Sequence, residues 1–199
     1  MNVHEALRWA QSKVGCGYVY GTFGQTCTPS LLAEKTKQYG SGHNYDKAVK
    51  WMGKVVYDCA GLIKAMRKEL DGVWADWSAD MFYDSVNPRP LSTAQPGDLL
   101  FRVVEGRAEH VGLCVGPGLC IEARGTLPGV VQSPFRTCGW THCATPVWME
   151  NGYSPEVEGM FKLGYIGDRD HWQAVFDRRV QPVPAYIEQV FRNVTKGAP

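Results

Sequence analysis

The stretch Asp58-Cys-Ala-Gly-Leu-Ile-Lys-Ala-Met-Arg-Lys-Glu-Leu-Asp-Gly72 has the periodicity of an amphipathic helix, and Asp71-Gly72 is typical of a helix end. The period starts at Cys59, so we expect a helix with this cysteine in its first turn. A thiol at that position feels the positive end of the helix dipole, which favours the nucleophilic thiolate. Buried, inert helix cysteines are also common, so a catalytic interpretation requires partners.

A second stretch, Glu109-His-Val-Gly-Leu-Cys-Val-Gly-Pro-Gly-Leu-Cys-Ile-Glu-Ala-Arg124, supplies such partners. Apolar residues alternate along both halves, which predicts a β-hairpin. A three-residue Gly116-Pro-Gly118 connection places Gly112 opposite Glu122. His110 and Glu122 are then diagonal neighbours on one face, with α-carbons about 7 Å apart. A cysteine at a helix start, a histidine and an orienting carboxylate form the nucleophile, base and orienter of a papain-type site.

The remaining patterns favour an α+β fold. A first helix is expected from a capping box at Asn2 and Glu5 to about Val14. A turn at Gln95–Asp98 precedes short predicted strands at 99–104, 111–115, 119–123 and 130–131. Helices followed by such strands indicate an antiparallel sheet rather than a doubly wound parallel one. Residues 25–54 show only a short helical pattern at 31–39 and are expected to form a long ordered loop.

Four motifs, in order along the chain, resemble those of NlpC-type cell-wall peptidases. Tyr57-Asp-Cys-Ala-Gly-Leu-Ile63 resembles the family signature Asp-Cys-Ser-Gly-Leu-Ile, and Gly17-Tyr-Val-Tyr-Gly21 resembles Pro-Tyr-x-Trp-Gly. Gln95-Pro-Gly-Asp-Leu-Leu-Phe101 and His110-Val-Gly-Leu-Cys-Val-Gly116 match the two blocks that follow. The similarity covers roughly residues 1–150, and four ordered motifs are far more specific than one.

The resemblance implies a papain-like fold, with the cysteine helix packed on a small antiparallel sheet. It also implies hydrolysis of the D-glutamyl-diamino acid bond of bacterial peptidoglycan stem peptides through a thioacyl-enzyme. In that scheme Cys59 is the nucleophile, His110 the base and Glu122 the orienting residue. Tyr18 matches the motif tyrosine and is expected beside the thiol, where it holds the substrate or the oxyanion; a core aromatic is the alternative. The other expected substrate-binding residues are Asp58, Ala60 and Gly61.

Three departures from the family pattern stand out. Glu122 replaces the more usual histidine, asparagine or glutamine and adds a negative charge beside His110. Ala60 replaces a serine, which removes a hydroxyl contact to a substrate amine, although the Asp58 carboxylate is still available to it. The segment from residue 21 to 57 is longer than usual and is expected to act as a lid over the cleft.

We expect a boundary near residue 152, between a peptidase domain (1–152, with the insertion at 21–57) and a small helical tail (153–199). Helices are expected at 170–176 and 184–194. The tail resembles a helical segment of some bacteriophage lytic proteins, which implies wall targeting by an endolysin. A helical hairpin docked on the peptidase is the alternative.

Composition limits the other possibilities. With 21 basic and 20 acidic residues the net charge is +1, so neither nucleic acid nor a membrane surface is an expected partner. The start of the chain lacks signal-peptide character, so we expect synthesis in the cytoplasm and access to the wall through holin-type release or another non-classical route. A bacterial effector or a muropeptide-recycling enzyme would look similar. The sequence gives no indication of an oligomeric state.

Seven cysteines, an odd number, argue against a disulfide framework. No Cys-x-x-Cys pair exists and only Cys138, His142 and Cys143 cluster, so we expect no metal or other cofactor. Cys114 and Cys120 fall within predicted strands and are expected to serve as packing residues.

Two other functions remain open at this point. The same catalytic set would serve an amidase that cuts between muramic acid and L-alanine, or an acyl-transfer effector acting on host protein. A non-catalytic wall-binding module is less compatible with the sequence, because Cys59, His110 and a polar orienter are all present.

Overall fold

The computed structural model describes residues 1–150, 152, 155–166 and 168–176. It divides into two compact units: Met1 with Ala6–Met149, and Asn2–Glu5 with the residues from Glu150 onward. Within the described ranges, no helix is both long and apolar enough to cross a bilayer.

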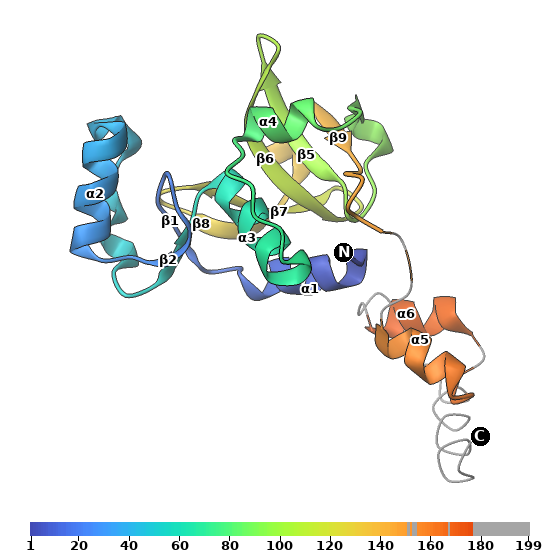
Figure 1. Cartoon of the computed structure of the whole chain (residues 1–199). Helices are drawn as coiled ribbons and strands as arrows, with labels where there is room; N and C mark the ends of the chain where they lie inside the picture. Colours follow the sequence, from blue (N-terminus) through green and yellow to red (C-terminus); the bar gives the residue numbers. More distant parts are fainter. Residues whose placement is uncertain (151, 153–154, 167, 177–199) are drawn as a thin grey trace. The chain divides into compact units, whose positions relative to one another are not determined.

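The larger unit is built on a six-stranded antiparallel sheet with strand order β4-β9-β5-β6-β7-β8 (Figure 1). The strands are β4 (Arg89–Pro90), β5 (Leu99–Val104), β6 (Arg107–Gly116), β7 (Leu119–Gly125), β8 (Gly129–Pro134) and β9 (His142–Ala144). Strands β5 to β8 confirm the predicted strands and the α+β class. Strands β4 and β9 were not predicted, because two or three residues are too short to show a period of two.

Helix α3 (Cys59–Asp71) packs on β6 and β7, with Leu62, Ile63 and Met66 fully buried. Burial of each such side chain contributes about 1.5–3 kcal/mol. The Asp58 side chain caps the helix start by accepting from the Gly61 N–H, and Gly72 ends the helix in the left-handed conformation at φ 69°. Both predicted helix ends are therefore confirmed.

Two further α-helices and two short 3-10 helices belong to the chain around this sheet. Helix α1 (Val3–Ser12) begins after Asn2, whose Oδ1 accepts from the His4 N–H at 2.8 Å, and it ends slightly before the predicted Val14. Helix α4 (Ala79–Asp84) contacts β6 and was not predicted, because six residues in a polar stretch carry little helical pattern. The short 3-10 helices are η3 (Leu91–Thr93) and η4 (Phe135–Thr137).

The segment predicted as a long ordered loop is instead mostly regular structure. Strands β1 (Gly17–Tyr18), β2 (Phe23–Thr26) and β3 (Val55–Tyr57) form a second sheet of order β1-β3-β2, with β1 parallel to β3. Between β2 and β3 lie α2 (Pro29–Tyr39), η1 (Ser41–His43) and η2 (Lys47–Trp51). Only the helical pattern at 31–39 had indicated any of these elements.

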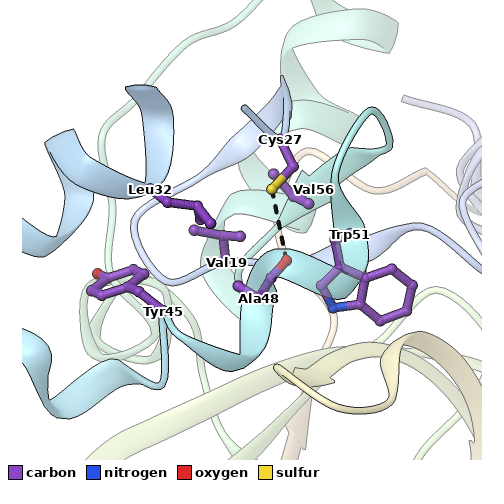
Figure 2. Packing of buried hydrophobic residues seen from close by; sticks show 7 residues of the cluster. All are labelled: Val19, Cys27, Leu32, Tyr45, Ala48, Trp51 and Val56. Carbon is purple, nitrogen blue, oxygen red and sulfur yellow. Dashed lines mark hydrogen bonds between the residues drawn. The ribbon is translucent and has the colours of Figure 1, made fainter. Parts of the chain in front are cut away.

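This segment has a core of its own, shown in Figure 2. The Trp51 ring closes the cluster on one side, and its Nε1–H donates to the Thr126 carbonyl at 2.6 Å. The Cys27 thiol donates to the Ala48 carbonyl at 3.8 Å. The cluster consists of Val19, Cys27, Leu32, Tyr45, Ala48, Trp51 and Val56.

The smaller unit contains α5 (Pro155–Lys162) and α6 (Arg169–Phe176), which pack around Val157, Ile166 and Trp172. Helix α6 confirms the helix predicted at 170–176. Helix α5 was not predicted, because the composition change just before it was interpreted as a linker. The helix predicted at 184–194 lies outside the described residues, and the domain assignment stays a prediction.

Candidate active site

His110 and Glu122 lie on adjacent strands and contact one another, as the alternation predicted. The His110 Nε2 atom is 2.8 Å from Glu122 Oε2, and both side chains are buried. The connection between β6 and β7 is shorter than predicted, but a bulge between Cys114 and Gly116 restores the register, with Leu113 opposite Ile121. Because the carboxylate binds Nε2, Nδ1 is the ring nitrogen that remains for chemistry.

The Glu122 carboxylate is fully buried and has three close hydrogen-bond donors, His110, Ser133 and Cys138, with the Cys120 thiol farther away at 3.9 Å. Ser133 Oγ donates to Oε1 at 2.6 Å, and Cys138 Sγ lies 2.8 Å from each carboxylate oxygen. Burial by itself raises the pKa of Glu122, but the hydrogen bonds from His110, Cys138 and Ser133 outweigh it and the pKa is lowered. Glu122 is therefore held as a carboxylate, with His110 as one of its donors.

The His110 ring is also fixed by stacking. The Trp140 ring lies parallel to it, with 5.1 Å between centroids and 15° between planes. Gly112 makes room for this tryptophan, since a β-carbon there would lie 2.9 Å from its Cη2 atom. Carboxylate and indole together fix the position and the tilt of the imidazole.

Cys59 lies at the start of α3 and lines a cavity, but its thiol is not preactivated. Burial raises the pKa of Cys59 to about 12, and the neighbouring Asp58 acts in the same direction. The backbone N–H groups of Val111, Ala60 and Cys59 act in the opposite direction. The helix-start effect is thus present, but the prediction of a stabilised thiolate is wrong, because desolvation of the thiolate outweighs that effect.

The sulfur lies beside the strand that carries the histidine. It accepts a hydrogen bond from the backbone N–H of Val111, which follows His110 in the chain. Among the described side chains, Cys59 and His110 share no hydrogen bond. In unliganded sites such bonds are often long and tighten only when substrate binds.

Asp58 joins the cysteine helix to the first motif. Its Oδ1 accepts from the Gly61 N–H at 2.5 Å, and its Oδ2 accepts from the Gly21 N–H at 2.8 Å. Burial raises the pKa of Asp58, and these two donors counter the shift. The Asp58 N–H in turn donates to the Thr22 carbonyl at 2.9 Å, so two hydrogen bonds join the two segments, while the bond to Gly61 caps the helix.

The other predicted substrate-binding residues occupy different environments. Ala60 lines the cavity with Cys59 and Asp58. Tyr18 does not line it, although burial and then the neighbouring Cys59 and Asp58 raise the pKa of its hydroxyl. Gly61 is buried, and a β-carbon there would lie 1.9 Å from the Thr22 carbonyl oxygen. The substrate-binding roles of all four residues stay predictions.

The cavity in front of Cys59 has a volume of about 660 Å³. Helix α2 supplies Lys35, Gln38 and Tyr39 on one side, so the long insertion forms a wall of the cleft. The ionisable residues that line the cavity include both acidic and basic side chains. Among them, Lys64 forms an ion pair with Asp76 at 2.7 Å. The remaining charged residues of the lining are Lys35, Asp58, Asp80, Glu105, Arg107 and Glu109.

Ser133, Cys138 and Trp140 were not anticipated as site residues. Ser133 lies on β8 two residues after Val131 and so on the same face, which was a usable signal, whereas Cys138 and Trp140 follow η4 without any period. Cys138 does not join His142 and Cys143, whose clustering in the sequence was considered for zinc. The Cys143 thiol instead donates to the Pro90 carbonyl at 3.3 Å. Cys114 and Cys120 are fully buried, which confirms their predicted packing role.

A cysteine at a helix start, next to the strand that carries a histidine whose Nε2 binds a carboxylate, on an antiparallel sheet, defines the class of papain-like cysteine peptidases. The sequence model of the NlpC/P60 family matches residues 37–149, more than half of the chain. The chain therefore belongs to the NlpC/P60 family.

Curated relatives and solved structures agree with this assignment. Peptidoglycan endopeptidase RipB of Mycobacterium tuberculosis (strain H37Rv) is 30% identical over 145 residues, which are 73% of this chain and 53% of the relative. Probable endopeptidase p60 of Listeria innocua is 31% identical over 113 residues, 56% of this chain and 22% of the relative. This chain thus spans about half, or less, of the length of these curated relatives.

Two solved structures show the same fold. The RipB structure has a TM-score of 0.51 at 25% identity and covers 71% of this chain and 63% of its own. The NlpC/p60 domain of peptidoglycan hydrolase SagA has a TM-score of 0.51 at 19% identity and covers 72% of this chain and 98% of its own. The second likeness concerns the fold alone.

Proposed function

We propose that this chain is a cysteine endopeptidase that hydrolyses peptidoglycan stem peptides at the D-glutamyl-diamino acid bond. The observation that carries the proposal is the buried His110–Glu122 pair, in which His110 lies on the strand next to Cys59. Cys59 itself lines the cavity. The curated relatives are named as endopeptidases, one of them as a peptidoglycan endopeptidase.

The geometry supports a general-base mechanism that starts from a neutral thiol. Because the pKa of Cys59 is about 12, its proton must leave during attack, and Nδ1 of His110 accepts it. The sulfur then bonds to the substrate carbonyl carbon, and Glu122 stabilises the positive charge on the ring. The imidazolium returns the proton to the departing amine as the carbon–nitrogen bond breaks. Water hydrolyses the thioacyl-enzyme in the reverse order of proton transfers.

Mass spectrometry of products from purified peptidoglycan tests this assignment. We expect fragments with a new amino terminus on the diamino acid, and no product from Cys59→Ala at an unchanged melting temperature. Removing a nucleophile costs several kcal/mol of transition-state stabilisation, about tenfold in rate for each 1.4 kcal/mol. A new amino terminus on L-alanine would identify an amidase instead. Unchanged hydrolysis by Cys59→Ala would exclude Cys59 as the nucleophile.

We further propose that residues 153–199 bind the wall polymer, in the manner of an endolysin tail that acts after release from the cytoplasm. Tethering raises the effective concentration of enzyme on a polymer but not on a small substrate. Removal of 153–199 should therefore lower the rate on intact walls more than on soluble muropeptides. Equal losses on both substrates, or loss of cooperative unfolding, would assign the segment to packing.

A further inference from the structure

We propose that His110, Glu122 and Cys138 form a binding site for a thiophilic divalent cation such as Zn²⁺, and that the bound cation switches the enzyme off. Binding stands on the geometry alone. Only the inhibition rests on the proposed function. The catalytic scheme has no use for Cys138, yet its sulfur lies beside the carboxylate that orients the base.

The three side chains already converge on one point. One potential ligand atom from each lies within 4.8 Å of the others. Tetrahedral Zn²⁺ sites require separations of about 3.4 Å between nitrogen and oxygen ligands and about 3.6 Å between sulfur and oxygen. The present distances are 2.8 Å from His110 Nε2 to Glu122 Oε2 and 2.8 Å from Cys138 Sγ to either oxygen. The nitrogen–oxygen and sulfur–oxygen contacts must therefore widen by less than about 1 Å to admit the ion.

The donor set also suits the charge of the ion. A nitrogen, an oxygen and a sulfur ligand form a typical zinc set, with a fourth position left for water. The cation displaces the Cys138 thiol proton to solvent, so a thiolate and the Glu122 carboxylate together balance its two positive charges. Cys120 lies just behind this set, with its sulfur 3.9 Å from Glu122 Oε1.

The ion has a route to the site. Cys138 is half-buried as a residue whereas His110 and Glu122 are buried, so an ion enters from the side of Cys138. The Arg124 Nε atom lies 3.5 Å from Glu122 Oε1 and must move to admit a second cation. Its side chain is 32% exposed and its Nε has no hydrogen-bond partner among the described residues, so turning outward breaks no hydrogen bond, and the bound cation replaces the ion pair with Glu122.

The inhibition follows from tautomer chemistry. With Nε2–H bonded to Glu122, the free lone pair lies on Nδ1, where the Cys59 proton must go. A cation on Nε2 takes the lone pair of that nitrogen, so the ring proton moves to Nδ1. The nitrogen available to Cys59 is then a donor and cannot accept the thiol proton. The ion on Nε2 thus prevents Nδ1 from acting as a base, although it does not occupy the cavity in front of Cys59.

Cobalt provides a direct binding test, because a thiolate ligand gives Co²⁺ a near-ultraviolet charge-transfer band. The full chain with Cys59→Ala, reduced and freed of metal, is titrated with Co²⁺. We expect one Co²⁺ per chain, a band that Cys138→Ser abolishes, and a band that Cys16→Ser, a half-buried thiol outside the cluster, leaves intact. His110→Gln should weaken binding while keeping the band. A band that survives Cys138→Ser, or no band at all, overturns the site.

The inhibition has its own measurement. Muropeptide hydrolysis is followed against Zn²⁺ concentration, with each variant scaled to its own rate in chelator. Cys138→Ser should raise the inhibitory concentration by more than the roughly 10–100-fold that loss of an outer-shell partner costs. Equal inhibition of Cys138→Ser and Cys16→Ser would place the inhibitory ion elsewhere. If no substrate is hydrolysed at all, the proposed function fails while the cobalt result still stands.

Discussion

The catalytic region and the insertion of this protein are held together in opposite ways. Around His110 and Glu122 the buried contacts are polar: an imidazole, a hydroxyl and a thiol each form a hydrogen bond with the Glu122 carboxylate. Between β2 and β3 the buried contacts are apolar and aromatic, around Trp51 and its cluster. Buried polar networks fail when one member is lost, whereas apolar cores tolerate exchange at similar volume. Chemistry and cleft shape thus depend on separate sets of contacts.

The largest effect on stability is expected from Trp51→Ala, which removes the main ring of the insertion core. Loss of a buried tryptophan costs about 3–5 kcal/mol. If the two regions are independent, kcat on a soluble muropeptide should change less than tenfold at temperatures where the variant is still folded. Trp51→Phe is the matched control: it keeps most of the packing and loses only the hydrogen bond to Thr126, worth about 1 kcal/mol. A collapse of kcat in folded Trp51→Ala would show that the regions are coupled.

Gly61→Ala changes the contact between helix α3 of the catalytic region and Thr22 at the start of the insertion. Its β-carbon would lie 1.9 Å from the Thr22 carbonyl oxygen, so either α3 or the start of the insertion must shift. Overpacking of this kind costs typically 1–3 kcal/mol, and a backbone contact belongs at the upper end, about 3 kcal/mol. Gly42→Ala is the control, since a β-carbon there meets nothing within 4 Å. Urea unfolding compares the two; equal stability would mean that the close approach is not needed.

Glu122→Gln tests the polar network itself. Three donors converge on two carboxylate oxygens, and an amide offers only one acceptor, so at least one donor loses its partner. We expect kcat/KM to fall roughly 100-fold, about 2.7 kcal/mol, and Glu122→Ala to fall further. Ser133→Ala removes one donor and leaves the charge, so it should cost less than either. If both Glu122 variants match the wild type in kcat/KM, another group orients His110.

The same substitution has a signature in the pH dependence of stability. The pKa of Glu122 lies below its ordinary value of 4.5 in the folded state, so the unfolded chain binds its proton first as the pH falls. The stability that this carboxylate contributes is complete above that ordinary value and is lost as the pH falls through the folded pKa. The difference in unfolding free energy between wild type and Glu122→Gln should therefore shrink as the pH falls from above the ordinary value of 4.5 through the lower pKa of the folded state. A constant difference would contradict the lowered pKa.

Asp58→Asn should give the smallest effect and separates charge from geometry at the thiol. Burial is the main cause of the high pKa of Cys59, and the Asp58 charge is the second. Asparagine removes that charge, so the pKa of Cys59 should fall below about 12 and alkylation at about pH 8 should accelerate. One of the two N–H groups that Asp58 accepts loses its acceptor, at about 1 kcal/mol. Iodoacetamide rates against pH measure the shift; an unchanged curve would assign the whole pKa elevation to burial.

The pairing of His110 with Glu122 could be predicted from the sequence better than the residues that surround this pair. Alternation in one hairpin determines which residues share a face, so the contact of His110 with Glu122 could be predicted from the positions of the two residues along their strands. Cys138 and Trp140 come from a turn where no periodicity exists, and only tertiary structure brings them to the carboxylate. The thiolate prediction failed for a related reason, because desolvation of Cys59 depends on everything packed around it.

In the insertion, local signals were present but too short to count. Thr28 caps α2 and Pro29 opens it, yet the remaining elements are strands and 3-10 helices of two to five residues. Their apolar residues, such as Cys27 and Tyr45, meet only in three dimensions, without a common period. Long-range packing rather than local propensity gives this segment its structure.

The two ends of the insertion are held close together, so the segment between them is suited to replacement as a unit. The chain leaves the catalytic region near Thr22 and returns at Asp58, where parallel pairing of β1 with β3 and the Asp58–Thr22 hydrogen bond hold exit and entry side by side. Lengthening a loop between fixed ends costs only about 0.6 kcal/mol per doubling. We therefore expect that the piece between these anchors can be replaced by one of different length while the nucleophile keeps its position. Libraries of such replacements offer a route to retune which wall fragments the enzyme accepts while its chemistry stays in place.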